Sequence, residues 1–147
     1  MISANYYIRK GYFQKLNGAV FSNGQPVKVY DGMVPNNAVY PYIILSTQTA
    51  SDTSVKRCQG QEATMLVDVV TGYTGEVERE TIDDIANQIF QLINPVDSSG
   101  FIDAGTDLQV ISTRLISDTT MEAQNDVYKV LRRLIRFTHR VQEQVNI

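Results

Sequence analysis

The spacing of apolar residues predicts two helices. Between residues 76 and 93 apolar residues recur at intervals of three and four, and Asn94-Pro95 then ends the predicted helix. Residues 4–17 form a second such segment, with Ser3 as a candidate N-cap. Gly11 lies inside this segment and should cost it about 1 kcal/mol relative to alanine. The first helix carries the stripe Ile8, Tyr12 and Leu16, and the second carries Ile82, Ile85, Ala86, Ile89 and Ile93.

Alternating or continuous apolar runs predict strands at 27–30, 43–49, 63–73 and 108–117. The run at 63–73 is apolar on both faces at several positions, which favours the middle of a sheet. Asp68 interrupts this run, and we expect it to face a solvated edge. The polar segment 51–61 reads as an exposed hairpin tip, and Ser22-Asn23-Gly24 reads as a turn.

Residues 127–141 fit two patterns. Five apolar positions have helical spacing, whereas alternation puts apolar and arginine side chains on opposite sides. We favour a long, bulged strand, because the strand at 108–117 needs a partner and the polar loop 118–126 suits a hairpin. The predicted fold is one α+β domain over residues 1–147. It has an antiparallel sheet of four to five strands and two helices on one face.

Charge is distributed unevenly along the 147 residues, although the net charge is only −3. Residues 1–75 have net charge +2, with six basic and four acidic residues. Residues 76–126 have two basic and eleven acidic residues, and residues 127–147 have five basic and one acidic. This separation fits two interpretations, which are differently charged solvated faces or a subunit whose negative face meets the positive face of a neighbour.

Few residues are available for catalysis or metal binding. A single Cys58 excludes an intrachain disulfide, and a single His139 excludes a paired-histidine metal site. We interpret His139 as a surface histidine and Cys58 as an exposed loop thiol. The aspartate-rich turns at 97–100 and 103–107 lack the spacing of a calcium loop. We therefore expect no cofactor, no metal and no enzymatic activity.

Two charged groups remain as candidate contact residues. The acidic group occupies the start of the second helix, where negative charge suits the helix dipole. The basic group could contact a nucleic-acid backbone or, more economically, another protein surface. The acidic residues are Glu76, Glu80, Asp83 and Asp84, and the basic residues are Lys56, Arg57, Lys129, Arg132, Arg133, Arg136 and Arg140.

The order of elements resembles a known family. The chain has a short strand at Val27–Tyr30, then Tyr40-Pro41-Tyr42-Ile43-Ile44-Leu45, and later a basic strand at 131–137. Over residues 4–142 this arrangement resembles the tail-completion, or tail-terminator, proteins of tailed bacteriophages. The resemblance implies an α+β subunit of a homo-oligomeric ring, often hexameric. Such a ring caps the tail tube and joins it to the head connector, and DNA passes through its lumen.

The resemblance also implies a virion protein that is assembled in the host cytoplasm. No apolar run exceeds four residues, so no membrane helix is expected. Three alternatives stay open. They are a neck adaptor ring of a short-tailed phage, a nucleic-acid-binding module using residues 129–140, and a small hydrolase around His139 or Cys58.

Overall fold

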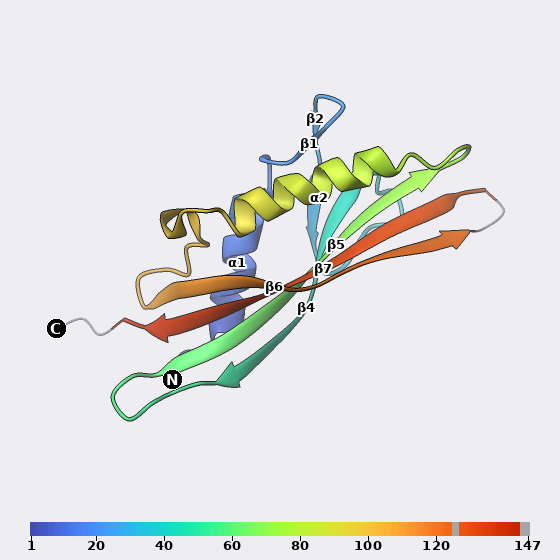
Figure 1. Cartoon of the computed structure of the whole chain (residues 1–147). Helices are drawn as coiled ribbons and strands as arrows, with labels where there is room; N and C mark the ends of the chain where they lie inside the picture. Colours follow the sequence, from blue (N-terminus) through green and yellow to red (C-terminus); the bar gives the residue numbers. More distant parts are fainter. Residues whose placement is uncertain (125–126, 145–147) are drawn as a thin grey trace.

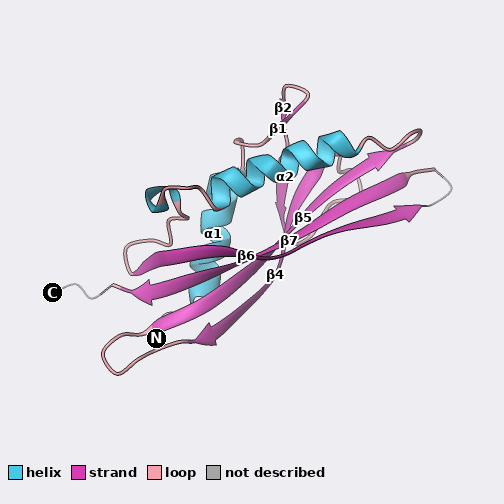
Figure 2. Ribbon diagram, viewed as in Figure 1, coloured by secondary structure: helices cyan, strands magenta, loops and turns pink. Residues whose placement is uncertain are grey.

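A five-stranded sheet with two helices on one face makes up most of the protein (Figures 1 and 2). The computed structural model describes residues 1–124 and 127–144. The helices are α1 (Ala4–Leu16), α2 (Arg79–Ile93) and the 3-10 turn η1 (Ser98–Gly100). The strands are β1 (Phe21–Ser22), β2 (Gln25–Pro26), β3 (Lys28–Asp31), β4 (Tyr42–Asp52), β5 (Gly60–Tyr73), β6 (Leu108–Gln124) and β7 (Lys129–Glu143).

The two helices confirm the predictions made from apolar spacing. The residues of each predicted stripe are buried in α1 and α2. Ser3 occupies the N-cap position of α1, but its side chain makes no capping hydrogen bond. Gly11 is buried, and a Cβ added there would collide with Ile102. This glycine is therefore required by the close approach of the segment around Ile102 to α1.

The sheet has the strand order β3-β4-β5-β7-β6. The α+β class is confirmed, but the sheet is mixed rather than wholly antiparallel, because β3 pairs parallel with β4. The predicted turn at 22–24 joins β1 and β2 in a separate antiparallel hairpin, with positive φ at Asn23 and Gly24. The peptide bond between Tyr40 and Pro41 is cis.

The core lies between the helices and one face of the sheet. Alternate residues of β5 on this face, from Ala63 to Val69, have no exposed surface. Phe137 of β7 lies between the two helices, with ring centroids 6.4 Å from Tyr12 of α1 and 5.8 Å from Phe90 of α2. We call this the helix face, and the opposite side of the sheet the open face.

The C-terminal hairpin differs from its prediction in one respect. Residues 129–143 form a strand, as favoured, and β7 lies between β5 and β6. The predicted polar loop 118–126 is wrong over its first seven residues, because β6 continues to Gln124 and pairs with β7 as far as Lys129. Residues 125–126 lie outside the described residues. The side chains of this part of β6 are exposed, so no apolar alternation reveals the strand.

Candidate functional site

The basic residues of β7 divide between the two faces of the sheet. Arg133 pairs in register with the buried Val69 and lies on the helix face. Arg132, Arg136 and Arg140 pair with Val70, Leu66 and Glu62 and lie on the open face, because neighbouring residues of a strand point to opposite sides. The predicted basic group is therefore two groups with different surroundings.

Arg132 and Arg133 are neutralised within the chain. Arg132 Nη2 donates to Asp68 at 2.5 Å, and this hydrogen bond raises the pKa of the guanidinium. The expected solvated position of Asp68 is wrong, because its side chain is only 7% exposed. Arg133 donates to Asp118 at 2.6 and 2.8 Å and to Asp83 at 2.9 Å. Its pKa is also raised, mainly by the hydrogen bonds to Asp118.

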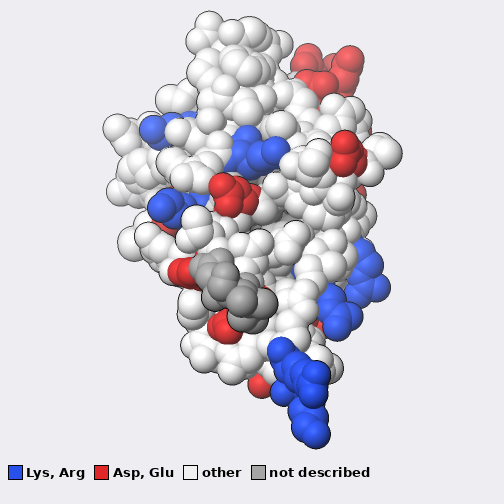
Figure 3. Space-filling model, turned by 90° about the vertical axis from the view of Figure 1, so that its left-hand side faces the viewer, with Lys and Arg blue, Asp and Glu red and all other residues white. Residues whose placement is uncertain are grey.

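Other predicted basic residues have no carboxylate contact within the described part of the chain. Arg136 donates to the hydroxyls of Thr64 and Thr47, at 3.1 and 2.9 Å. Arg140 and Lys129 are exposed near opposite ends of β7. Lys56 and Arg57 lie in the hairpin between β4 and β5, which projects at the lowest point of the molecule and shows blue side chains at its tip in Figure 3.

The predicted acidic residues lie at the other end of β5. Glu76 and Glu80 are exposed, in the β5–α2 connection and the first turn of α2. Asp84 accepts from Gln88, and Asp83 accepts from Arg133, so two of the four make contacts within the chain. About 13 strand residues at roughly 3.3 Å each separate the two ends of β5, which is about 43 Å. The acidic end and the Lys56–Arg57 tip are therefore not brought together within one molecule.

The surface position expected for His139 is wrong. Its side chain is completely buried on the helix face. Nδ1 is 2.9 Å from the Thr113 hydroxyl, and Nε2 is 2.5 Å from the Tyr12 hydroxyl. Burial lowers the pKa of the imidazole to about 4 and raises that of the Tyr12 phenol. His139 is thus a neutral core residue that links α1, β6 and β7.

Cys58 lies at the edge of a shallow hollow on the surface. The thiol is partly exposed, and its sulfur accepts from Gln142 of β7. The hollow has a volume of about 400 Å³ and includes Arg140 and Ile111 in its lining. No group of three or more His, Cys, Asp or Glu side chains suited to a metal ion occurs in residues 1–124 and 127–144. None of the described helices is long and apolar enough to span a membrane.

Comparison with protein families decides what kind of protein this is. A model for "Tail completion protein gp17" matches residues 18–140. The chain belongs to this tail completion family. It is a structural protein of a phage-type virion tail, as the family name and the resemblance in sequence both indicate.

The fold of this tail completion protein recurs in a solved virion structure. A chain from the virion of a native gene transfer agent particle superposes with a TM-score of 0.73 at 16% sequence identity. The match covers 97% of the tail completion protein and 99% of the virion chain. At this identity the likeness establishes the fold. A comparison with curated proteins finds no match.

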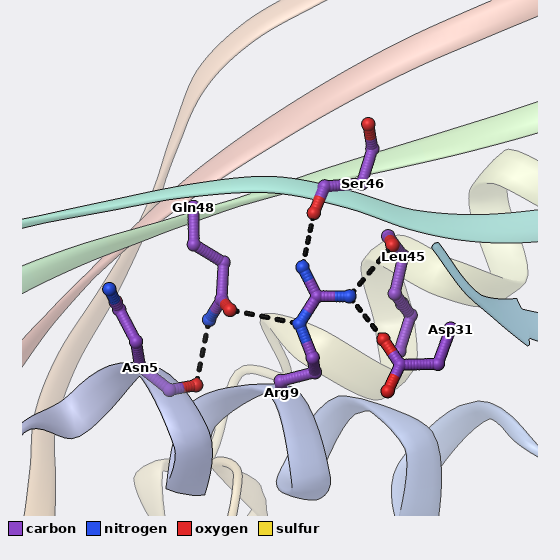
Figure 4. Close-up of polar contacts among 6 residues, drawn as sticks. All are labelled: Asn5, Arg9, Asp31, Leu45, Ser46 and Gln48. Carbon is purple, nitrogen blue, oxygen red and sulfur yellow. Dashed lines mark hydrogen bonds and ion pairs between the residues drawn. The ribbon is translucent and has the colours of Figure 1, made fainter. Parts of the chain in front are cut away.

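One edge of the sheet in the tail completion protein is closed by Arg9, whose role the sequence pattern did not reveal. Arg9 of α1 donates to the carbonyl oxygens of Leu45 and Ser46, to Gln48 and to Asp31 (Figure 4). Leu45 is the last residue of β4 that pairs with β3, and the register of β4 with β5 shifts directly after it. At this point the guanidinium occupies the Ser46 carbonyl, an acceptor that another strand would otherwise use.

Gln48 extends this contact to the start of α1. Its amide nitrogen donates to the Asn5 carbonyl at 2.8 Å, and its amide oxygen accepts from Arg9 at 2.9 Å. Helix α1 is thereby fixed along the β4 edge, with its Ile8 and Tyr12 in the core.

The opposite edge of the tail completion protein is strand β6. In the described sheet this strand pairs with β7 alone. Four large apolar side chains on β6 are between 43% and 52% exposed, and they are Ile111, Leu115, Ile116 and Met121. None of them was predicted as a contact residue. Three lie in the predicted strand 108–117, and Met121 lies in the predicted polar loop 118–126.

Proposed function

We propose that this tail completion protein forms a ring of identical subunits, most simply a hexamer, at the head-proximal end of the phage tail. The ring stops growth of the tail tube and joins the tube to the head connector. DNA passes through the lumen without specific binding, and the protein acts through its shape and surfaces rather than through catalysis or a cofactor.

The family match over residues 18–140 carries this proposal. The family name supports a role in the completion of a tail. We expect this step to bring the protein into contact with the tube on one side and with the next component on the other. The chain also has suitable surfaces, because it presents charged residues at both ends of β5 and an apolar edge strand.

The predicted charged contacts divide into two classes under this proposal. Lys56, Arg57, Arg136 and Arg140 are the basic residues that we assign to contacts with neighbouring subunits or with the tube, and Lys129 joins them. Glu76 and Glu80 are their acidic counterparts. Asp84 is a weaker candidate because it contacts Gln88. Arg132, Arg133 and Asp83 make ion pairs within the subunit, so we expect them to support the contact surface indirectly.

Electron microscopy of the purified protein and of particles that contain it tests the proposal. Closed rings with a central channel, located between tube and head, are the expected result. A ring below the portal of a particle without a long tail would instead identify a neck adaptor. Salt-dependent DNA binding by a monomer that is missing from particles would favour a nucleic-acid-binding module and contradict the proposal.

Charge reversal provides a second test. Arg136→Glu removes a cation whose side-chain partners among the described residues are two threonine hydroxyls, so we expect ring or virion assembly to be impaired while the fold is retained. Arg132→Glu should impair assembly as well, but with loss of stability, because it places a carboxylate beside the buried Asp68. Lys28→Glu, at an exposed site on β3, is a matched control for the change in charge.

A further inference from the structure

Most arginines of the subunit are neutralised by carboxylates of the same chain. The five that form such ion pairs are Arg9, Arg79, Arg114, Arg132 and Arg133. A charge that is paired inside the subunit contributes little to the attraction between molecules. The charged side chains without an internal partner are therefore the ones that can select a partner molecule.

A basic surface without internal ion pairs lies at the end of the sheet where β5 begins. Lys56 and Arg57 form the turn at the tip of the β4–β5 hairpin, because the residues on either side of them, Val55 and Cys58, form a β-bridge. Arg140 of β7 lies beside the first residues of β5. None of these three cations contacts a carboxylate within the part of the chain that the structure describes.

Arg140 also lines the shallow hollow beside Cys58, which has a volume of about 400 Å³. The residue in register with Arg140 on β5 is Glu62, but this carboxylate is contacted by Arg114 at 3.4 Å and by the Thr138 hydroxyl at 3.3 Å. We call this hollow, together with the Lys56–Arg57 tip, the basic hollow. A concave surface with charges of one sign suits a projecting group of the opposite sign.

An acidic surface without internal ion pairs lies at the other end of β5. Residues 74–78, which we call the acidic loop, connect β5 to α2 and carry Glu76 and Glu78, and Glu80 follows in the first turn of the helix. All three side chains are exposed, and none contacts a basic group in residues 1–124 and 127–144. Figure 1 shows the acidic loop beyond the end of β5, at the opposite end of the molecule from the β4–β5 hairpin.

Other exposed carboxylates are engaged in local turns. Asp97 and Asp103 accept hydrogen bonds from the backbone N–H groups of Ser99 and Gly105, at 3.0 and 2.9 Å. The carboxylates of the acidic loop accept no such bond within the described residues. The acidic loop is therefore the anionic surface that is best suited to the basic hollow.

One molecule cannot bring these two surfaces together, because about 43 Å of β5 separates them. A contact between the acidic loop and the basic hollow must then join two copies. Since the two surfaces differ, each copy keeps one free surface after the first contact, so the contact can repeat until a ring closes. Charge also determines the direction of assembly, because contact between two like ends is repulsive.

We propose that the acidic loop of one copy docks in the basic hollow of the next copy, and that this contact joins successive subunits of the ring. This inference rests on the proposed function, because the occupant of the hollow is a second copy of the same chain. It selects a neighbouring subunit, rather than the tube, as the partner of Lys56, Arg57 and Arg140. It also adds Glu78 to the acidic contact residues.

Reversing the charges of each surface tests the contact. Arg57→Glu with Arg140→Glu makes the hollow acidic, and Glu76→Arg with Glu78→Arg makes the loop basic. All four sites are exposed, and the Glu78 side chain makes no capping hydrogen bond to α2, so both variants should stay folded. Circular dichroism and thermal unfolding check this expectation. Light scattering after size-exclusion chromatography then measures the assembled mass.

A matched control has the charge change of the hollow variant at sites away from both surfaces. Lys10→Glu with Lys28→Glu meets this requirement, because both lysines are exposed and lie on α1 and β3. We expect the wild type and the control to assemble. Each surface variant alone should elute with the 16.5 kDa mass of one chain, because its loop and its hollow then have charges of the same sign.

An equimolar mixture of the two surface variants should recover the mass of the wild type. In this mixture each acidic loop meets the basic hollow of the other variant, and each basic loop meets an acidic hollow. The two variants can alternate around a ring with an even number of subunits, such as a hexamer. An occupant other than this chain, such as DNA or an acidic tube protein, predicts instead that only the hollow variant is impaired.

Assembly of either surface variant alone to the wild-type mass would overturn the inference, and so would a mixture that stays monomeric. In both cases rings of the wild type would leave the proposed function intact. A wild-type mass of only two chains would also overturn it, because a twofold pair can use both contacts at once without forming a ring. If the wild type is monomeric in solution, the variants, alone and coexpressed, are scored by incorporation into particles. A wild-type chain that forms no ring and is missing from particles would contradict the proposed function, and with it this contact.

Discussion

Replacing His139 by glutamine should remove a large part of the acid sensitivity of this protein. The imidazole is completely buried and has a pKa of about 4, compared with an ordinary value of 6.5. Burial is the cause, because a charged imidazolium loses its hydration inside the core. The hydroxyls of Tyr12 and Thr113 can accept hydrogen bonds from either form, so they do not offset this loss.

The sign and size of the change in the free energy of unfolding follow from the difference in proton binding between the folded and unfolded states. Between pH 6.5 and pH 4 the unfolded state binds a proton at His139 that the folded state does not bind. The free energy of unfolding therefore has its full value above about pH 6.5 and falls as the pH is lowered towards 4. At about 1.4 kcal/mol for each unit of pKa difference, the loss is about 2 kcal/mol at pH 5 and about 3 kcal/mol below pH 4.

Urea denaturation at several pH values measures this loss. Glutamine keeps a donor and an acceptor but does not titrate. His139→Gln should be less stable than wild type at pH 7.5, because glutamine does not reproduce the fit of the neutral imidazole between Tyr12 and Thr113. The difference between the two proteins should narrow by about 2 kcal/mol at pH 5. Carboxylates titrate alike in both proteins and cancel in the comparison. A difference that stays constant from pH 7.5 to pH 5 would refute the assignment of His139 as a buried neutral base.

Two further substitutions test the packing of α1. Arg9→Ala removes the donors to the Leu45 and Ser46 carbonyls, and we expect a loss of about 1–3 kcal/mol in chemical denaturation, whereas exposed Lys10→Ala should change stability by less than about 0.5 kcal/mol. Equal effects of the two would contradict the role given to Arg9. Gly11→Ala should destabilise the protein by about 1–3 kcal/mol although alanine favours helices, because its Cβ would collide with Ile102 and approach the Asp103 carbonyl to 3.0 Å. Gly75→Ala, which has open space around it, is the control, and a stabilised Gly11→Ala protein would refute the packing argument.

Elements with one buried face were predictable from the sequence. Helix α2 has a regular apolar stripe, and its boundaries differ from the prediction only at the first turn. Strand β7 was ambiguous because its apolar residues fit both periods. The need of β6 for a partner resolved this ambiguity correctly.

The remaining features depend on contacts between distant residues. The second half of β6 has no buried face, so only hydrogen bonds to β7 define it as a strand. The burial of His139 requires Tyr12 from α1 and Thr113 from β6, which lie 127 and 26 residues away. The sequence shows charges at Asp68 and Arg132, but not that the fold brings these two residues together although they are 64 positions apart.

The candidate site was predictable in composition but not in arrangement. The charged groups at 56–57, 76–84 and 129–140 were identified from the sequence. Their division into paired and free residues required the register of β5 and β7, because only that register places Arg132 beside Asp68. The exposed isoleucines of β6 were hidden for a related reason, since a bulge leaves no mark in an alternating pattern.

The position of β7 between β5 and β6 has a consequence for synthesis. The ribosome completes β6 before β7, so β6 has no strand partner until the residues up to Glu143 have emerged. A nascent chain can form β3, β4 and β5 early, but its sheet ends at β5 until β7 is inserted. The exposed apolar side chains of β6 therefore take their final positions only after β7 has been translated, so an unfinished chain does not present them.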